Sequence, residues 1–185
     1  MPDVTRRHFI AIAGATATSV WLAAEARDLI AAGVHAAQAK RFEVLSDADA
    51  ADIEAAAAQI IPTDDTPGAR EARVIYFIDR SLGTFAKSQR RAFENGATEL
   101  RKRAGKVQRG ATSFVSLPND KQIEVIASLE KDKHEFFDAL RLGTIAGMLA
   151  NPEYGGNSNK TGWKWIGFDD HFSWAAPFGY YDRNA

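Results

Sequence analysis

Apolar side chains recur at helical spacing through the middle of the chain, between Ser46 and Met148. Residues three or four positions apart share one face of a helix, so such a stripe predicts a helix with one buried face. No segment there shows the sustained alternation typical of strands. The pattern predicts an all-α fold, a compact bundle of about five helices. After the first helix, the predicted stripes consist of Val74, Phe77, Ile78, Leu82 and Phe85; Phe93, Ala97, Leu100 and Ala104; Ile123, Ile126 and Leu129; and Phe136, Phe137, Leu140, Thr144 and Met148.

The first predicted helix, from Ser46 to Ile61, carries its own start and stop signals. Ser46 is a good N-cap residue, and Asp49 stands three residues later, at the capping-box position. Pro62 ends the helix because it has no backbone N–H to donate. In the turn cluster that follows, Pro67 predicts that the second helix begins close to it, since proline suits the first helical position.

The stretch from Asn151 to Phe168, NPEYGGNSNKTGWKWIGF, departs from this helical pattern. Pro152 and the Gly155-Gly156 pair disfavour a regular helix or strand. Its aromatic rings would leave much apolar area in water if they were exposed. We therefore expect an ordered, irregular segment whose rings pack against the core, a ligand or another protein.

Composition and charge narrow the possible functions. A chain of 185 residues with 45% apolar content can bury one core, and its net charge of -1 gives no general attraction to nucleic acid. The absence of cysteine excludes a disulfide framework, a Cys-ligated metal and a Cys nucleophile. Residues 87–109 are locally basic, with eight Lys and Arg against two Glu. A solvated helix face explains this best; a docking face for an acidic partner or a lipid surface is the alternative.

The N-terminus resembles a twin-arginine (Tat) export signal. Arg6 and Arg7 are followed by Phe9 and by a modestly apolar run over residues 10–24, and a small-x-small cleavage site ends at Ala39. The alternative is an ordinary amphipathic helix with two adjacent arginines. Tat substrates cross the membrane already folded, commonly with a cofactor or an assembled partner. This chain has no cofactor motif of its own, so the signal indicates a folded partner.

Candidate chemistry within the chain is sparse. The run Asp-Asp-His at 169–171 contains side chains that could ligate a metal or act as acid and base, but a metal site needs three or four ligands and no other segment offers them, so we expect a surface turn. His134 lies four residues after Glu130 and four before Asp138, a spacing at which all three could share a helix face. That spacing could bind a metal, but it fits an ordinary charged surface pair equally well. No nucleophile elbow, phosphate loop or dinucleotide fingerprint occurs. We predict no catalytic, cofactor-binding or metal residues in this chain.

Several spaced residues resemble the small-subunit family of gluconate 2-dehydrogenase (subunit 3, the γ subunit). They are Phe137, Leu140, Arg141, Thr144 and Gly147, then Asn151, Pro152, Glu153, Tyr154, Gly155, Gly156 and Asn157, then Gly162, Trp163, Ile166 and Gly167. The resemblance implies a non-catalytic subunit of a periplasmic, membrane-associated sugar, polyol or sugar-acid dehydrogenase. It implies a large flavoprotein subunit of the glucose-methanol-choline oxidoreductase type that holds FAD, and a multihaem cytochrome c as a possible third subunit. The small subunit of such complexes often carries the Tat signal for the large one.

The residues and the resemblance together give the expected organisation of the chain. We expect a Tat signal peptide over residues 1–39 and a helical small-subunit domain over 40–185, with 151–185 as an irregular aromatic tail. Trp163 is expected to point inward, and the rings beyond Phe172 to face the partner. From the resemblance we take over Tyr154, Gly155, Gly156, Asn157 and Trp163 as structural or interface candidates. Gly162, Gly167 and Trp174 complete the list of candidates.

Two other functions remain open on the residues alone. A freestanding periplasmic sugar-binding protein would use the C-terminal aromatic rings as stacking platforms. A metal-dependent enzyme would be built around Asp170 and His171.

Overall fold

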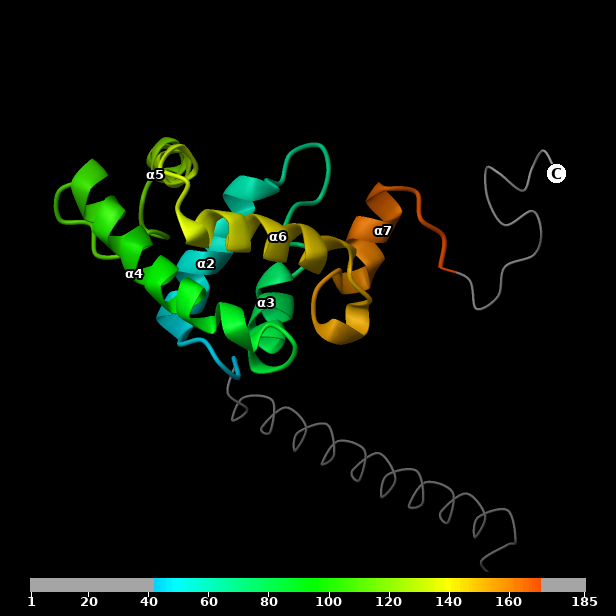
Figure 1. The fold of residues 1–185 in the computed structure, drawn as a ribbon. Coiled ribbons are helices and arrows are strands. Elements are labelled where there is room, and N and C mark those ends of the chain that lie inside the picture. Colours follow the sequence, from blue (N-terminus) through cyan, green and yellow to red (C-terminus); the bar gives the residue numbers. More distant parts are fainter. Residues whose placement is uncertain (1–41, 171–185) are drawn as a thin grey trace, which may run out of the picture. The chain divides into compact units, whose positions relative to one another are not determined.

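The computed structural model describes residues 42–170, which form one packed all-α unit (Figure 1). This part of the chain contains six α-helices, three short 3-10 helices and no strand, so the predicted fold class is confirmed with one helix more than expected. The α-helices are α2 (Asp47–Ile60), α3 (Val74–Gly83), α4 (Arg90–Val107), α5 (Asn119–Lys131), α6 (Glu135–Leu149) and α7 (Thr161–Trp165). The 3-10 helices are η1 (Lys87–Gln89), η2 (Pro152–Tyr154) and η3 (Ser158–Lys160).

Helix α6 runs through the middle of the domain and contacts each of the other described α-helices (Figure 1). Its apolar stripe is buried as predicted, with Phe136, Leu140 and Thr144 fully inaccessible to solvent. The Thr144 hydroxyl donates a hydrogen bond to the carbonyl of Leu140, which satisfies this buried polar group within its own helix. The α4 stripe is confirmed in the same way. Because every other described α-helix packs on α6, the way its ends are closed bears on the whole domain.

Helix α3 begins at Val74, so the prediction that it starts near Pro67 was wrong. The intervening chain forms turns that close against the end of α2. Gly68 approaches so closely that an added Cβ would lie 2.6 Å from the carbonyl oxygen of Ile61. The Glu71 carboxylate accepts hydrogen bonds from the Gly68 amide and the Thr63 hydroxyl. These local bonds compete successfully with helix formation over this segment.

Two apolar residues of the predicted stripes lie on the surface instead of in the core. Phe85 is 71% exposed because α3 ends before it, and its side chain leaves the buried face. Ile123 is 51% exposed, while Gln122 and Val125 occupy the buried face of α5 beside Ile126. The Gln122 amide bonds to the carbonyl of Leu117, which makes its burial tolerable. The first correction concerns where α3 ends, and the second concerns which face of α5 is buried. The few apolar positions in each stripe were not enough to predict either.

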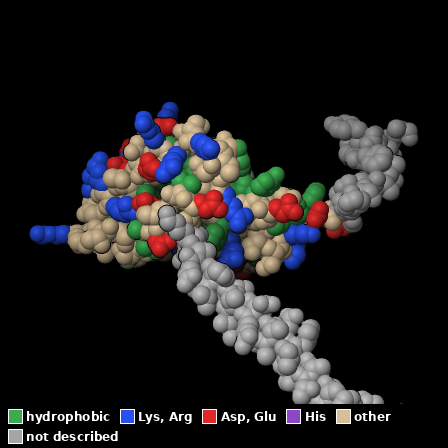
Figure 2. Space-filling view, turned by 90° about the horizontal axis from the view of Figure 1, so that it is seen from below, with side chains coloured by type: hydrophobic (Ala, Val, Ile, Leu, Met, Phe, Trp, Pro, Cys, Tyr) green, Lys and Arg blue, Asp and Glu red, His purple; other side chains and the backbone are tan. Residues whose placement is uncertain are grey.

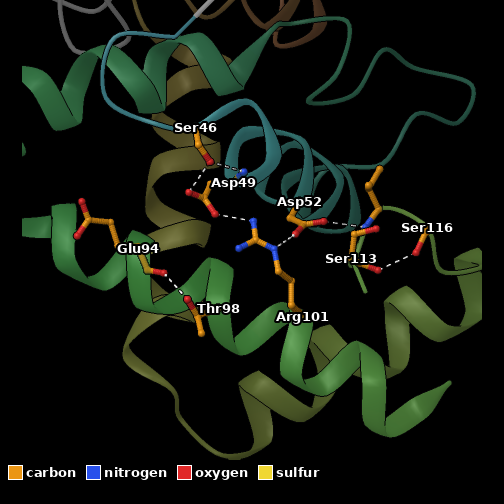
Figure 3. A network of polar contacts seen from close by, with 9 residues as sticks. Ser46, Asp49, Asp52, Glu94, Thr98, Arg101, Ser113 and Ser116 are labelled. Carbon is orange, nitrogen blue, oxygen red and sulfur yellow. Dashed lines mark hydrogen bonds and ion pairs between the residues drawn. The ribbon is translucent and has the colours of Figure 1, made fainter. Parts of the chain in front are cut away.

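An ionic network connects α2, α4 and the loop before α5 (Figure 3). Arg101 on α4 donates to the carboxylates of Asp49 and Asp52, both on α2. Asp52 is fully buried, and its other oxygen accepts the backbone N–H of Val115 at 3.0 Å. Ser46 caps α2 by accepting from the Asp49 amide and donating to its carboxylate, which confirms the predicted capping position. The network therefore fixes three segments at one point.

Partial burial works to raise the pKa of Asp49, but hydrogen bonds from Ser46 and Arg101 and the Arg101 charge hold it below the ordinary value of 3.8. A carboxyl whose pKa is lower in the folded state stabilises the fold above the unfolded-state value, and that contribution is lost as pH falls further. We expect Asp49→Asn to lower the melting temperature at pH 7, and the difference from wild type to shrink below about pH 4. Circular dichroism melts between about pH 2 and pH 7 test this, with the exposed Asp47→Asn as control; a pH-independent difference would contradict it.

Asp79 holds the first described residues onto the bundle. Its buried carboxylate on α3 accepts the backbone N–H groups of Glu43, Val44 and Leu45, at 2.7, 3.0 and 2.9 Å. The ring of Phe42 stacks on Tyr76, with the two centroids 5.2 Å apart. Packing against the core therefore already involves residue 42, shortly after the expected export segment.

The basic residues 87–109 are partly engaged within the domain. Arg90, Arg101, Lys102 and Arg103 each form an ion pair with a nearby carboxylate. Figure 2 shows blue basic groups interspersed with red acidic ones on the face in view. This supports the interpretation of a solvated helix face over that of a docking face. None of the helices in the described part of the chain has the length and apolar character that a membrane crossing requires.

Candidate functional site

The NPEYGGN segment, residues 151–157, closes the C-terminal end of α6. The last carbonyls of a helix have no intrahelical partner and need one from elsewhere. The carbonyl of Gly147 accepts the backbone N–H of Asn157 at 2.8 Å, and that of Ala150 accepts the Asn157 side-chain amide at 2.9 Å. The Asn157 side-chain oxygen accepts the N–H of Gly162 at 2.8 Å. One fully buried Asn thus joins α6 to α7.

Three glycines permit this close packing. Gly155 adopts φ 103°, a left-handed conformation that other residues reach only with strain. A Cβ on Gly156 would lie 2.2 Å from the carbonyl oxygen of Gly147, and one on Gly162 would lie 1.9 Å from that of Met148. Because both obstacles are backbone atoms, neither can move aside cheaply. The glycines therefore allow α7 to pack directly on the end of α6.

The segment is more regular than the sequence indicated. We expected no helix within residues 151–168, but this stretch contains η2, η3 and the short α-helix α7. The Asn151 side chain starts η2 by accepting the N–H of Glu153, with Pro152 at the first helical position. Proline is favoured at that position, so the residue taken as a helix breaker in fact begins one. The correction concerns the local backbone, since the order of the segment was expected.

The aromatic residues of the segment divide between packing and exposure. Trp163 is half-buried, and its indole N–H donates to the carbonyl of Leu149 at 2.7 Å. Its ring meets that of Phe168 edge to face at 5.1 Å. Tyr154 is 57% exposed, and Gly167 lies at the surface. Trp163 is thus only partly directed inward, and Tyr154 is the aromatic candidate with an exposed ring.

Other candidates lie beyond the described residues. They are the export-signal residues Arg6, Arg7 and Phe9, and Trp174 with the remaining rings after Phe172. Their roles stay predictions.

The three possible metal ligands on one helix face are separated by the fold. Glu130 belongs to α5, and Lys133 adopts a left-handed backbone conformation that interrupts the helix between α5 and α6. His134 caps α6 through its ring Nδ1, which accepts the N–H of Phe136. Asp170 pairs with Lys160 at 2.7 Å. Within residues 42–170, no three His, Asp or Glu side chains gather as a metal site would require.

An apolar groove lies between α3 and α6, with a volume of about 540 Å³. Its sides carry Phe85 and Leu142, each 71% exposed, and Phe93 lines it from α4. Phe85 rests against Phe77 with the ring centroids 6.1 Å apart. Figure 2 shows hydrophobic side chains reaching the surface among charged ones. Sequence reasoning missed this groove. The available signal was Leu142, an apolar residue of α6 that does not belong to the buried stripe.

These features define an all-helical domain whose central helix is closed by a glycine- and asparagine-dependent segment. The chain belongs to the gluconate 2-dehydrogenase subunit 3 family, whose family model matches residues 47–170. The match runs from the start of α2 to residue 170, beyond α7, and so includes both the helices and the NPEYGGN segment. It places the chain among the subunits of a dehydrogenase complex. Searches among curated proteins and among solved structures gave no match.

Proposed function

We propose that this chain is the non-catalytic small subunit of a periplasmic, membrane-associated dehydrogenase of sugars, polyols or sugar acids. Its large partner would be an FAD-containing flavoprotein of the glucose-methanol-choline oxidoreductase type, and a multihaem cytochrome c a possible third subunit. The family match over residues 47–170 is the observation that carries the proposal. FAD and haem c would reside in the other subunits.

The small subunit would act in export and assembly. The Arg6-Arg7 leader would direct the chain to the Tat translocase, and the folded flavoprotein would cross the membrane bound to it. This chain has no cofactor motif of its own. Its use of a route for folded proteins is explained if its partner must bind FAD before export. In the periplasm, the small subunit would remain bound and stabilise the flavoprotein.

Replacing both Arg6 and Arg7 by lysine should keep this chain and its flavoprotein partner in the cytoplasm. The test is to co-express the two chains and to measure periplasmic dehydrogenase activity and flavoprotein content after cell fractionation. We expect a fall of about tenfold or more in both relative to wild type, because the pair depends on one leader. Arg27→Lys, outside the twin-arginine pair, serves as the matched control. Partner export that persists without the pair, or without the whole chain, would refute the proposal.

A further inference from the structure

The groove between α3 and α6 continues into a second hollow of about 330 Å³ at the end of α3. The two share Phe77, Ser81 and Phe85, and the second extends to Tyr154 in the NPEYGGN segment. We call this continuous surface the α3–α6 trough. Along its α6 wall, Glu135 to Ala146 cover eleven residue steps, or about 16 Å at the helical rise per residue. That length fits about three turns of another helix.

The charges at the edge of the trough are unbalanced. Its acidic residues are Glu43, Glu135, Asp138 and Glu153, and its one cationic residue in the described part of the chain is Arg80. The Arg80 guanidinium donates to the backbone carbonyl of Glu153 at 3.1 Å. None of these four carboxylates forms an ion pair within residues 42–170, whereas Asp49, Asp52, Glu94 and Glu99 are all paired with arginines of α4. Glu135 and Asp138 also suit the N-terminal turn of α6, and both side chains are exposed to solvent there.

We propose that the α3–α6 trough receives a basic amphipathic helix of the flavoprotein subunit. This inference rests on the proposed function and identifies its docking surface. The occupant would place an apolar ridge, spaced i, i+4, i+7, between Phe85 and Leu142, and would carry Lys or Arg toward Glu135 and Asp138. The long walls of the trough are helices, whose backbone groups are bonded internally, so recognition proceeds through side chains, as in helix-in-groove binding.

Charge favours a partner helix over the chain's own residues 171–185 as the occupant of the trough. The chain's own residues 171–185 contain one arginine and one aspartate, and therefore bring no surplus of positive charge. They also contain Pro177 and Gly179, which disfavour a three-turn helix. A partner helix with flanking cations meets both requirements of the trough, its apolar floor and its acidic edge.

Leu142→Arg should weaken the complex without unfolding this chain, because Leu142 is mostly exposed. The experiment uses the full chain and its flavoprotein partner, with binding measured by titration. We expect the dissociation constant to rise about tenfold or more, as loss of an apolar anchor implies. Ile123→Arg on α5, also exposed, is the matched control and should leave binding unchanged. Both variants should melt within a few degrees of wild type.

Asp138→Lys should reduce the affinity for the flavoprotein and weaken the dependence of that affinity on salt, since edge charges act through long-range attraction.

A photo-crosslinking residue at position 142 should crosslink to a Lys- or Arg-bearing helix of the flavoprotein. Crosslinks to residues 171–185 or to a second copy of this chain would overturn the inference. Normal binding of Leu142→Arg would overturn it too, while leaving the proposed function intact. If the wild-type chain fails to bind the flavoprotein at all, the proposed function itself fails.

Discussion

Replacing Gly162 by alanine should destabilise the domain by about 3 kcal/mol, near the upper end of overpacking costs. The added Cβ would lie 1.9 Å from the carbonyl oxygen of Met148, well inside van der Waals contact. That oxygen belongs to α6, which contacts every other described α-helix, so it cannot move without disturbing the core. The alternative is for α7 to move away, which lengthens the bond from Gly162 to Asn157. Urea denaturation of the isolated chain measures the loss.

Gly105→Ala is the control for this substitution. Gly105 is an exposed residue of α4, where an added Cβ would come no nearer than 3.6 Å to the carbonyl oxygen of Ala111. Alanine is the better helix former, so this variant should gain about 0.5 to 1 kcal/mol. If Gly162→Ala proved as stable as Gly105→Ala, the closure of α6 by this segment would be wrong.

The helical fold and the main buried stripes could be predicted because they depend on local spacing. Phe93, Leu100, Phe136 and Leu140 recur at a period that only a helix brings to one face. The capping position at Ser46 was equally accessible, since its two bonds connect residues three apart in sequence. These signals are contained within one or two turns of chain, where sequence reasoning is strongest, although the helix start expected near Pro67 shows that a local signal can also mislead.

Features that depend on distant partners were not accessible in this way. Asp79 reads as one more charged residue of an amphipathic helix, yet its buried carboxylate accepts three amides from residues 43–45. Asn157 gives no sign in sequence that its side chain bridges Ala150 and Gly162. Leu142 was visible as an apolar residue off its stripe, but its counterpart across the trough, Phe85, comes from another element. Sequence spacing specified the helices and left open how their ends and outer faces are used.

The ion pair between Arg101 and Asp52 provides the strongest electrostatic test of the bundle. The Asp52 side chain is 1% exposed and that of Arg101 31%, so removing the guanidinium leaves a carboxylate with little access to water. Val115 still donates to one of its oxygens, but the oxygen facing Arg101 loses its partner. Arg101→Met should therefore cost about 3 kcal/mol, at the low end for a broken buried pair because the guanidinium is partly hydrated.

A double-mutant cycle separates lost attraction from the cost of the stranded charge. If most of the stability lost in Arg101→Met comes from the unpaired Asp52 carboxylate, the same substitution should cost much less in an Asp52→Asn background. A neutral amide is far less costly to leave without that partner. Arg90→Met is the matched control: Arg90 lies on the same helix and pairs with Glu94 at 2.9 Å, but both side chains are about half exposed. Such a surface pair contributes at most about 0.5 kcal/mol. Equal losses for Arg90→Met and Arg101→Met, measured by urea denaturation, would show that burial of Asp52 does not set the strength of this network.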